Sequence, residues 1–187
     1  MFALAFLIAA APVPAEATAA EKYEAAVLAS IHWFARQNED EHLGALLEKH
    51  PKLVSEVERF RQPRKPYSTD AYTPLHWAAR EGHARAAAVL INYKANMNAD
   101  CGNGWTPLHL AALGGHLDVV KTLVENGANT DAKTMALPER EYYAPSQPPG
   151  LVQKPINLPA SPARTALDIA IEAKKPAVAD YLRSVRK

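Results

Sequence analysis

The stretch Thr73-Pro74-Leu75-His76-Trp77-Ala78-Ala79 has a second copy in this chain. It returns 33 residues later as Thr106-Pro107-Leu108-His109-Leu110-Ala111-Ala112. A Gly-His pair follows each copy, at 82–83 and 115–116, and an Ala-Asn pair follows further on, at 95–96 and 128–129. Two copies in register over this length indicate an internal repeat, and such a period is typical of a stack of small structural units.

Two degenerate copies flank this pair. Residues 165–170 (TALDIA) keep Thr165 and put Asp168 in the histidine position, whereas residues 31–35 (IHWFA) keep His32 and the alanine. The outer copies are therefore expected to cap the two ends of a stack, where one face of each meets water. A leucine lies fourteen residues after the histidine position in every copy, at Leu46, Leu90, Leu123 and Leu182.

These motifs resemble the ankyrin repeat, whose signature is T-P-L-H-x-A at a 33-residue period. The resemblance implies an all-α solenoid of helix-turn-helix units joined by β-turn finger loops. On this basis, the domain spans residues 20–187. Its four repeats cover about 28–56, 72–100, 105–133 and 164–187. The spacing between motifs exceeds the period twice, which places finger insertions at 57–71 and 135–163.

The residue types of the motif suit the start of a helix. Thr73 and Thr106 are good N-cap residues, because a threonine side chain can accept a hydrogen bond from the first turn. The proline that follows each of them suits the first helical position, where no N–H is needed. The alanine pairs at 78–79 and 111–112 are small enough to let neighbouring helices approach closely.

Glycines mark the expected ends of helices. Gly82 and the pair at 114–115 break the first helix of their units and permit a tight reversal. Gly127 suits a left-handed C-cap at the end of a second helix. Lys94 and His50 hold that position in the two earlier repeats, where they are expected to strain the cap.

Composition is that of an ordinary globular domain. The chain has 187 residues, of which 48% are hydrophobic and 22% charged, so it can bury a sizeable core. With 21 basic and 20 acidic residues the net charge is +1, which argues against a nucleic-acid partner. The single cysteine, Cys101, cannot form an intramolecular disulfide and is compatible with either redox environment.

The first nineteen residues have the pattern of a secretory signal peptide. Ten apolar residues, 2–11, are followed by the small-x-small triplets Ala15-Glu16-Ala17 and Ala17-Thr18-Ala19. The run is too short to span a bilayer, which needs ~20 residues. We expect residues 1–19 to be cleaved and the protein to be periplasmic or secreted. No Lys or Arg precedes the run, so a packed N-terminal helix in a cytoplasmic protein or a retained membrane tether stays open as an alternative.

No pattern in the chain indicates catalysis or metal binding. His32, His76 and His109 recur at one repeat position, and packed helices lie about 8–10 Å apart, too far for these side chains to share a zinc ion. The resemblance instead makes the motif histidine a structural hydrogen-bonding residue. Motifs of hydrolases, zinc proteases and nucleotide-binding proteins are missing from the sequence. We therefore expect no catalytic residue, metal or cofactor, and we expect Cys101, beside the turn at 102–104, to be exposed and incidental.

The resemblance implies a non-enzymatic module that binds a protein partner of unknown identity through its concave face and fingers. Aromatic and arginine residues are enriched at binding hot spots. The predicted partner-binding residues are Trp105, Met97, Asn103, Arg61, Tyr142 and Tyr143.

Two other functions stay open. One is a small extracytoplasmic enzyme or ligand-binding protein with a pocket under the 135–163 insertion. The other is a protective partner of a periplasmic enzyme. Both insertions are also compatible with plain solvated loops.

Overall fold

The computed structural model describes residues 18–56, 72–101, 104–136, 140–142, 156–158 and 162–185. Within these residues the chain forms eight α-helices, which follow one another in pairs. They are α1 (Ala19–Gln37), α2 (Asp40–Lys49), α3 (Pro74–Glu81), α4 (Ala84–Asn92), α5 (Pro107–Gly114), α6 (Leu117–Glu125), α7 (Ala166–Glu172) and α8 (Pro176–Val185). A short 3₁₀ helix (Pro51–Ser55) follows α2.

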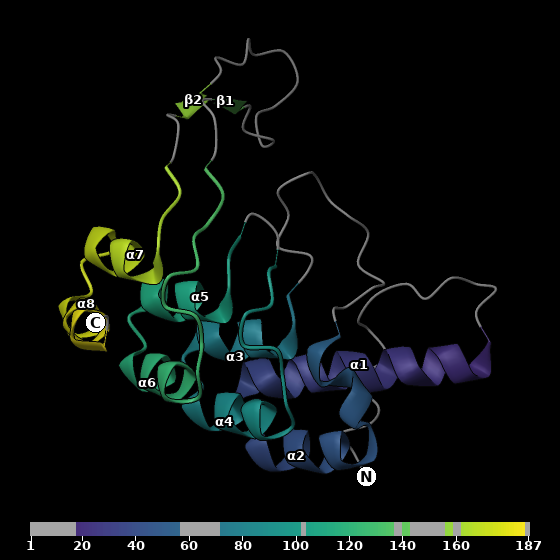
Figure 1. Ribbon diagram of the computed structural model, residues 1–187. Helices are drawn as coiled ribbons and strands as arrows, with labels where there is room; N and C mark the ends of the chain where they lie inside the picture. Colours follow the sequence, from purple (N-terminus) through teal and green to yellow (C-terminus); the bar gives the residue numbers. More distant parts are fainter. Residues whose placement is uncertain are drawn as a thin grey trace.

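The helices stack in two parallel rows. The first helices of the pairs, α1, α3, α5 and α7, pack side by side in chain order, and the second helices, α2, α4, α6 and α8, form the other row (Figure 1). Each pair therefore covers the apolar face of the pair before it, which a single helix pair cannot bury alone. The all-α repeat fold predicted from the sequence is confirmed.

The core is built from leucines and alanines at equivalent positions of the repeats. Leu90 and Leu123, fourteen residues after their motif histidines, are fully buried. The alanine pairs of α3 and α5 are also fully buried, between neighbouring helices of the first row. Small side chains at this contact allow a close approach of the two backbones, and this is why larger residues are missing there.

Threonines start the helices of the first row. Thr73, Thr106 and Thr165 have extended backbones immediately before α3, α5 and α7. Helix α1 is different, because it begins at Ala19, well before the expected repeat start at about residue 28. Its N-cap is Thr18, whose hydroxyl accepts from Glu21 N–H while the Glu21 carboxylate accepts from Thr18 N–H. This reciprocal capping box allows the helix to form ahead of the motif.

The ends of the helices use left-handed backbones. Gly82 and Gly115 cap α3 and α5 with φ of +83° and +81°. Lys94 has φ +67°, the strained left-handed conformation expected of it. The same expectation for His50 is wrong, since its φ is −131°. Pro51 follows His50 and begins the 3₁₀ helix, and a proline ring pushes the residue before it towards an extended backbone.

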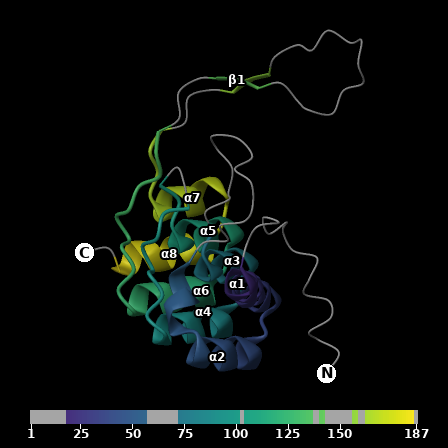
Figure 2. The same cartoon turned by 90° about the vertical axis from the view of Figure 1, so that its right-hand side faces the viewer.

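The second insertion carries a small antiparallel strand pair. Strand β1 (Arg140–Tyr142) pairs with β2 (Ile156–Leu158), with Glu141 opposite Asn157. Both strands stand away from the helices, on the arm that connects α6 to α7 along the chain (Figures 1 and 2). The first insertion, 57–71, and residues 1–17 of the predicted signal peptide lie outside the described residues. In the described part of the chain, no helix has the length and hydropathy required to cross a bilayer.

Two glycines with the same backbone conformation provide a test of the packing between repeats. A Cβ on Gly82 would lie 2.5 Å from Nδ1 of His116, whereas a Cβ on Gly127 (φ +93°) would meet nothing within 4 Å. We expect Gly127→Ala to lower the free energy of unfolding by about 1 kcal/mol, through backbone strain alone. Gly82→Ala should cost about 2–3 kcal/mol, because the His116 side chain must also give up its hydrogen bond. Urea unfolding of both variants measures the difference, and equal losses would contradict this account.

Candidate protein-interaction surface

The motif histidine His76 ties its repeat to the next. Thr73 N–H donates to Nδ1 of His76 at 3.1 Å, and Nε2 of His76 lies 3.3 Å from the carbonyl oxygen of Trp105 in the following repeat. Because Nδ1 accepts, Nε2 carries the proton and donates. His109 makes the same bond to its own cap, with Thr106 N–H 3.1 Å from Nδ1, but its Nε2 lies 3.1 Å from the carbonyl oxygen of Ala132, at the end of its own repeat.

The histidines of the Gly-His pairs make a second set of bonds between repeats. Nε2 of His83 lies 2.9 Å from the Arg36 carbonyl oxygen, and Nε2 of His116 lies 3.0 Å from the Arg80 carbonyl oxygen. These imidazoles point back to the preceding repeat, whereas His76 and His109 point forward. Across the described ranges, no three His, Cys, Asp or Glu side chains are grouped so that they could hold a metal ion.

Burial keeps the motif histidines neutral. The pKa of His76 is lowered from 6.5 to about 4, chiefly by burial, although its backbone hydrogen bonds and Asp100 act in the opposite direction. Burial also lowers the pKa of His109. A neutral imidazole is the form that accepts at one nitrogen and donates at the other, so this protonation state fits both hydrogen bonds.

Cys101 is buried, and the expectation that it is exposed was wrong. It packs with Tyr72 and Leu110 in a small second core, against which the half-buried Trp77 and Trp105 also lie. Its backbone N–H donates to the Trp105 carbonyl oxygen, and this bond turns the finger residue inwards. Burial, with Asp100 nearby, raises the pKa of the thiol to about 12. Since the thiolate is the reactive form, this environment does not activate Cys101 as a nucleophile.

The row of first helices presents a surface of aromatic, basic and apolar side chains. The residue after the motif histidine is Trp33 in α1 and Trp77 in α3, and the residue three positions further on is Arg36, Arg80 or Leu113. Residues three apart share one face of a helix. Trp33 is 48% exposed and Leu113 47%, whereas Trp77 is half-buried. We call these five residues the inner-helix face.

Two arginines from different repeats meet at one tryptophan of this face. Cζ of Arg36 lies 5.0 Å from the centroid of the Trp77 ring, and Cζ of Arg80 lies 5.5 Å from it. Both distances are within the range of a cation–π interaction. The Tyr72 ring packs edge-on against the same indole at 5.0 Å. Burial raises the pKa of Tyr72, an effect that the neighbouring Arg80 partly offsets.

The structure describes three of the six predicted partner-binding residues, and they lie in different parts of the fold. Trp105 is half-buried in the second core, with its ring 6.0 Å from that of His109, and Met97 packs against the main core. Tyr142 lies on β1, at the arm of the second insertion. Asn103, Arg61 and Tyr143 lie outside the described residues. None of these contact assignments is tested by the structure, and they stay predictions.

Sequence reasoning missed the inner-helix face. Its signal was present in the repeat register, because the two positions that follow the motif histidine by one and four residues hold Trp, Arg and Leu in three consecutive repeats. Positions on the outside of a helix vary between repeats, whereas those in the core do not. Aligning the repeats would have marked these two columns, whereas the burial of Leu110, their sixth residue, is known only from the structure.

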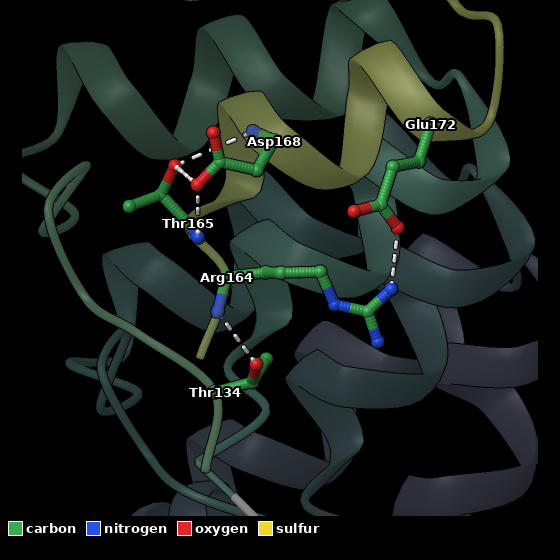
Figure 3. Close-up of polar contacts among 5 residues, drawn as sticks. All are labelled: Thr134, Arg164, Thr165, Asp168 and Glu172. Atoms are coloured by element: carbon green, nitrogen blue, oxygen red, sulfur yellow. Dashed lines mark hydrogen bonds and ion pairs between the residues drawn. The ribbon is translucent and has the colours of Figure 1, made fainter. Parts of the chain in front are cut away.

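Hydrogen bonds join the two ends of the second insertion at its base (Figure 3). Thr134 N–H donates to the Arg164 carbonyl oxygen at 2.9 Å, and Arg164 N–H donates to Oγ1 of Thr134 at 3.1 Å. Next to this pair, Oδ2 of Asp168 accepts from Thr165 N–H at 2.9 Å and from the Thr165 hydroxyl at 2.8 Å. Arg164 also forms an ion pair with Glu172, so the two ends of the insertion meet at a well-bonded point.

The neutral motif histidines predict a loss of stability in mild acid. In the unfolded chain His76 binds a proton near pH 6.5, whereas in the fold it does so near pH 4, so the free energy of unfolding falls with pH between these values. We expect a decrease of about 2 kcal/mol from pH 7 to pH 5 for His76, and His109 adds to it in the same direction. Urea unfolding at the two pH values measures it. His76→Gln should reduce the slope, and an equal slope in that variant would contradict the assignment.

Comparison with known families agrees with this geometry. The family model described as ankyrin repeats, in three copies, matches residues 31–134. That match covers more than half of the chain and includes helices α1 to α6 wholly or in part. No curated protein matches the chain in sequence. On the matched motifs and the stacked helix pairs that they build, the chain belongs to the ankyrin-repeat family.

Proposed function

We propose that this protein is a non-enzymatic interaction module that holds a partner protein against its inner-helix face and finger loops. Ankyrin repeats are generally protein–protein interaction modules. The observation that carries the proposal here is the inner-helix face, where tryptophan, arginine and leucine side chains stay exposed on a rigid row of helices. Tryptophan and arginine are among the residue types that dominate the binding energy at protein interfaces, and an exposed leucine beside them adds apolar area.

The buried titratable groups support an interaction function rather than catalysis. His76 and His109 use both ring nitrogens in bonds that cap and join repeats, so neither has a nitrogen left for a substrate. The Cys101 thiol is buried and its pKa is raised. The second insertion, with Tyr142 on β1, stands away from the helices (Figure 1), and we include it as a further contact for the partner.

Paired substitutions on exposed residues test the inner-helix face. The full chain, tagged and cross-linked in its host, recovers the partner, and Trp33→Ala combined with Leu113→Ala should weaken this interaction about tenfold or more. Ile171→Ala is the matched control, because Ile171 is 48% exposed but lies on α7, in the last described helix pair, outside the inner-helix face. Exposed substitutions of this kind change the free energy of unfolding by only about 0.5 kcal/mol, so urea unfolding separates loss of binding from loss of fold.

Deletion of residues 137–160 tests the finger contribution in the same assay. Thr134 and Arg164 already hold the two ends of the insertion together, so the shortened chain can close without moving the helices. Unchanged recovery in both the double variant and the deletion would refute the proposed surface.

We also propose that the protein works outside the cytoplasm and that its mature chain begins at Thr18. The apolar run and the Ala-x-Ala triplets support export. The capping box of α1 favours cleavage after the first triplet, Ala15-Glu16-Ala17, over cleavage after the second. Cleavage after Ala17 keeps Thr18 and its bonds with Glu21, whereas cleavage after Ala19 removes the N-cap of α1.

The mass and the N-terminal sequence of the protein purified from its native host identify the cleavage site. We expect a chain that starts at Thr18 and that is found in the periplasmic or secreted fraction. A chain that still carries Met1 in the cytoplasmic fraction would overturn the proposal of export, and a chain that starts at Ala20 would overturn the role of the cap.

A further inference from the structure

We propose that the Arg36–Trp77–Arg80 cluster of the inner-helix face binds an acidic segment of the partner protein, in which Asp or Glu side chains stand beside aliphatic ones. This inference rests on the interaction function proposed above and names the chemistry of the partner. It starts from the position of two guanidinium groups, contributed by α1 and α3, at one indole ring.

The indole holds the two guanidinium groups in a defined place. A guanidinium over an aromatic face still donates its N–H groups in its own plane, where a carboxylate can accept two of them. Tyr72 packs edge-on against Trp77 and is itself buried, so the ring has little freedom to move. Arginines that are placed before binding lose less conformational entropy when a carboxylate arrives.

The charge of the cluster is unbalanced. In the described part of the chain, the carboxylate paired with these two arginines is that of Glu81, whose Oε1 lies 4.0 Å from Nε of Arg36. Two guanidinium groups and one carboxylate leave one positive charge in excess. The Arg36 side chain is 56% exposed, so an incoming carboxylate can reach it from solvent.

Apolar side chains stand on either side of the charged cluster. Trp33 precedes it on α1, and Leu113 occupies on α5 the position that Arg80 occupies on α3. Both are about half exposed, at 48% and 47%. A segment that places carboxylates on the arginines can therefore bury aliphatic side chains on Trp33 and Leu113, and each buried methylene contributes about 0.8 kcal/mol.

A protein segment suits this surface better than a nucleic acid does. Binding to a phosphate backbone depends on several basic side chains in a row. Here the equivalent position on α7 holds Glu172, which is exposed, and the position on α5 holds the apolar Leu113. At this position of the described first-row helices, basic side chains are therefore limited to Arg36 and Arg80 in adjacent repeats.

A synthetic peptide with the repeating sequence Glu-Leu-Ser tests the inference on the full chain. We expect saturable binding by calorimetry, with the Trp77 indole signal shifting in NMR spectra, and an affinity that falls as salt is raised. The double variant R36Q/R80Q should have an affinity for the peptide that is lower by about tenfold or more, because two charge-assisted hydrogen-bonding groups are lost. R183Q is the matched control, since Arg183 is 54% exposed and forms a surface ion pair with Asp180 on α8.

Three results with the isolated chain would overturn the inference, and a fourth comes from the cross-linking assay. The three are no binding of the Glu-Leu-Ser peptide, equal binding of a Gln-Leu-Ser peptide, and tighter binding of a single-stranded oligonucleotide that is lost in R36Q/R80Q. Circular dichroism checks the fold of the double variant, and R80Q alone replaces it if the double variant does not fold. If R36Q/R80Q still binds the cross-linked partner while the Trp33/Leu113 variant does not, the interaction function stands and the acidic segment is excluded.

Discussion

The stack depends on one imidazole used at both of its nitrogens. In His76, Nδ1 accepts from the threonine that begins the same helix, and Nε2 donates to a carbonyl oxygen of the next repeat. A single side chain thus completes a helix cap and fixes the distance to the neighbouring unit. The two hydrogen bonds require an uncharged imidazole that is shielded from solvent, and the burial of His76 provides both conditions. Any change that protonates or moves this ring acts on two repeats at once.

The two end repeats each keep one of the two hydrogen bonds that His76 makes, either the bond to the helix cap or the bond to the next repeat. Asp168 replaces the histidine in the last described repeat and keeps the local cap with Thr165. A carboxylate cannot donate forward, and no further repeat follows there in the described chain. At the other end, His32 keeps the forward contact, with Nε2 3.1 Å from the Tyr72 carbonyl oxygen. Its Nδ1 lies 2.9 Å from the Leu28 carbonyl oxygen, because α1 runs through the place where the other repeats have a threonine.

Surfaces that are buried between repeats cannot contact a partner, so recognition of a partner depends on the surfaces that stay exposed after stacking. The alanine pairs, Leu90 and Leu123 are buried between helices, whereas Trp33 and Leu113 of the inner-helix face are exposed and the arm of the second insertion stands away from the helices (Figure 2). The arm is joined to the stack through Thr134 and Arg164, so its insertion leaves α5 and α7 in direct contact. This explains how a repeat protein can carry a long insertion at one edge without losing the regular row.

The sequence by itself determined the repeat register, the starts of α3, α5 and α7, and the family, because caps and helix periodicity are interactions between residues three or four apart. It did not determine that Cys101 is buried, that Trp105 is half-buried, or that Arg36 reaches Trp77. Those facts depend on which repeats face each other and at what distance. The contacts behind them join side chains of different repeats, so they form only when the repeats stack. The tertiary structure alone therefore decided where charge and aromatic surface come together.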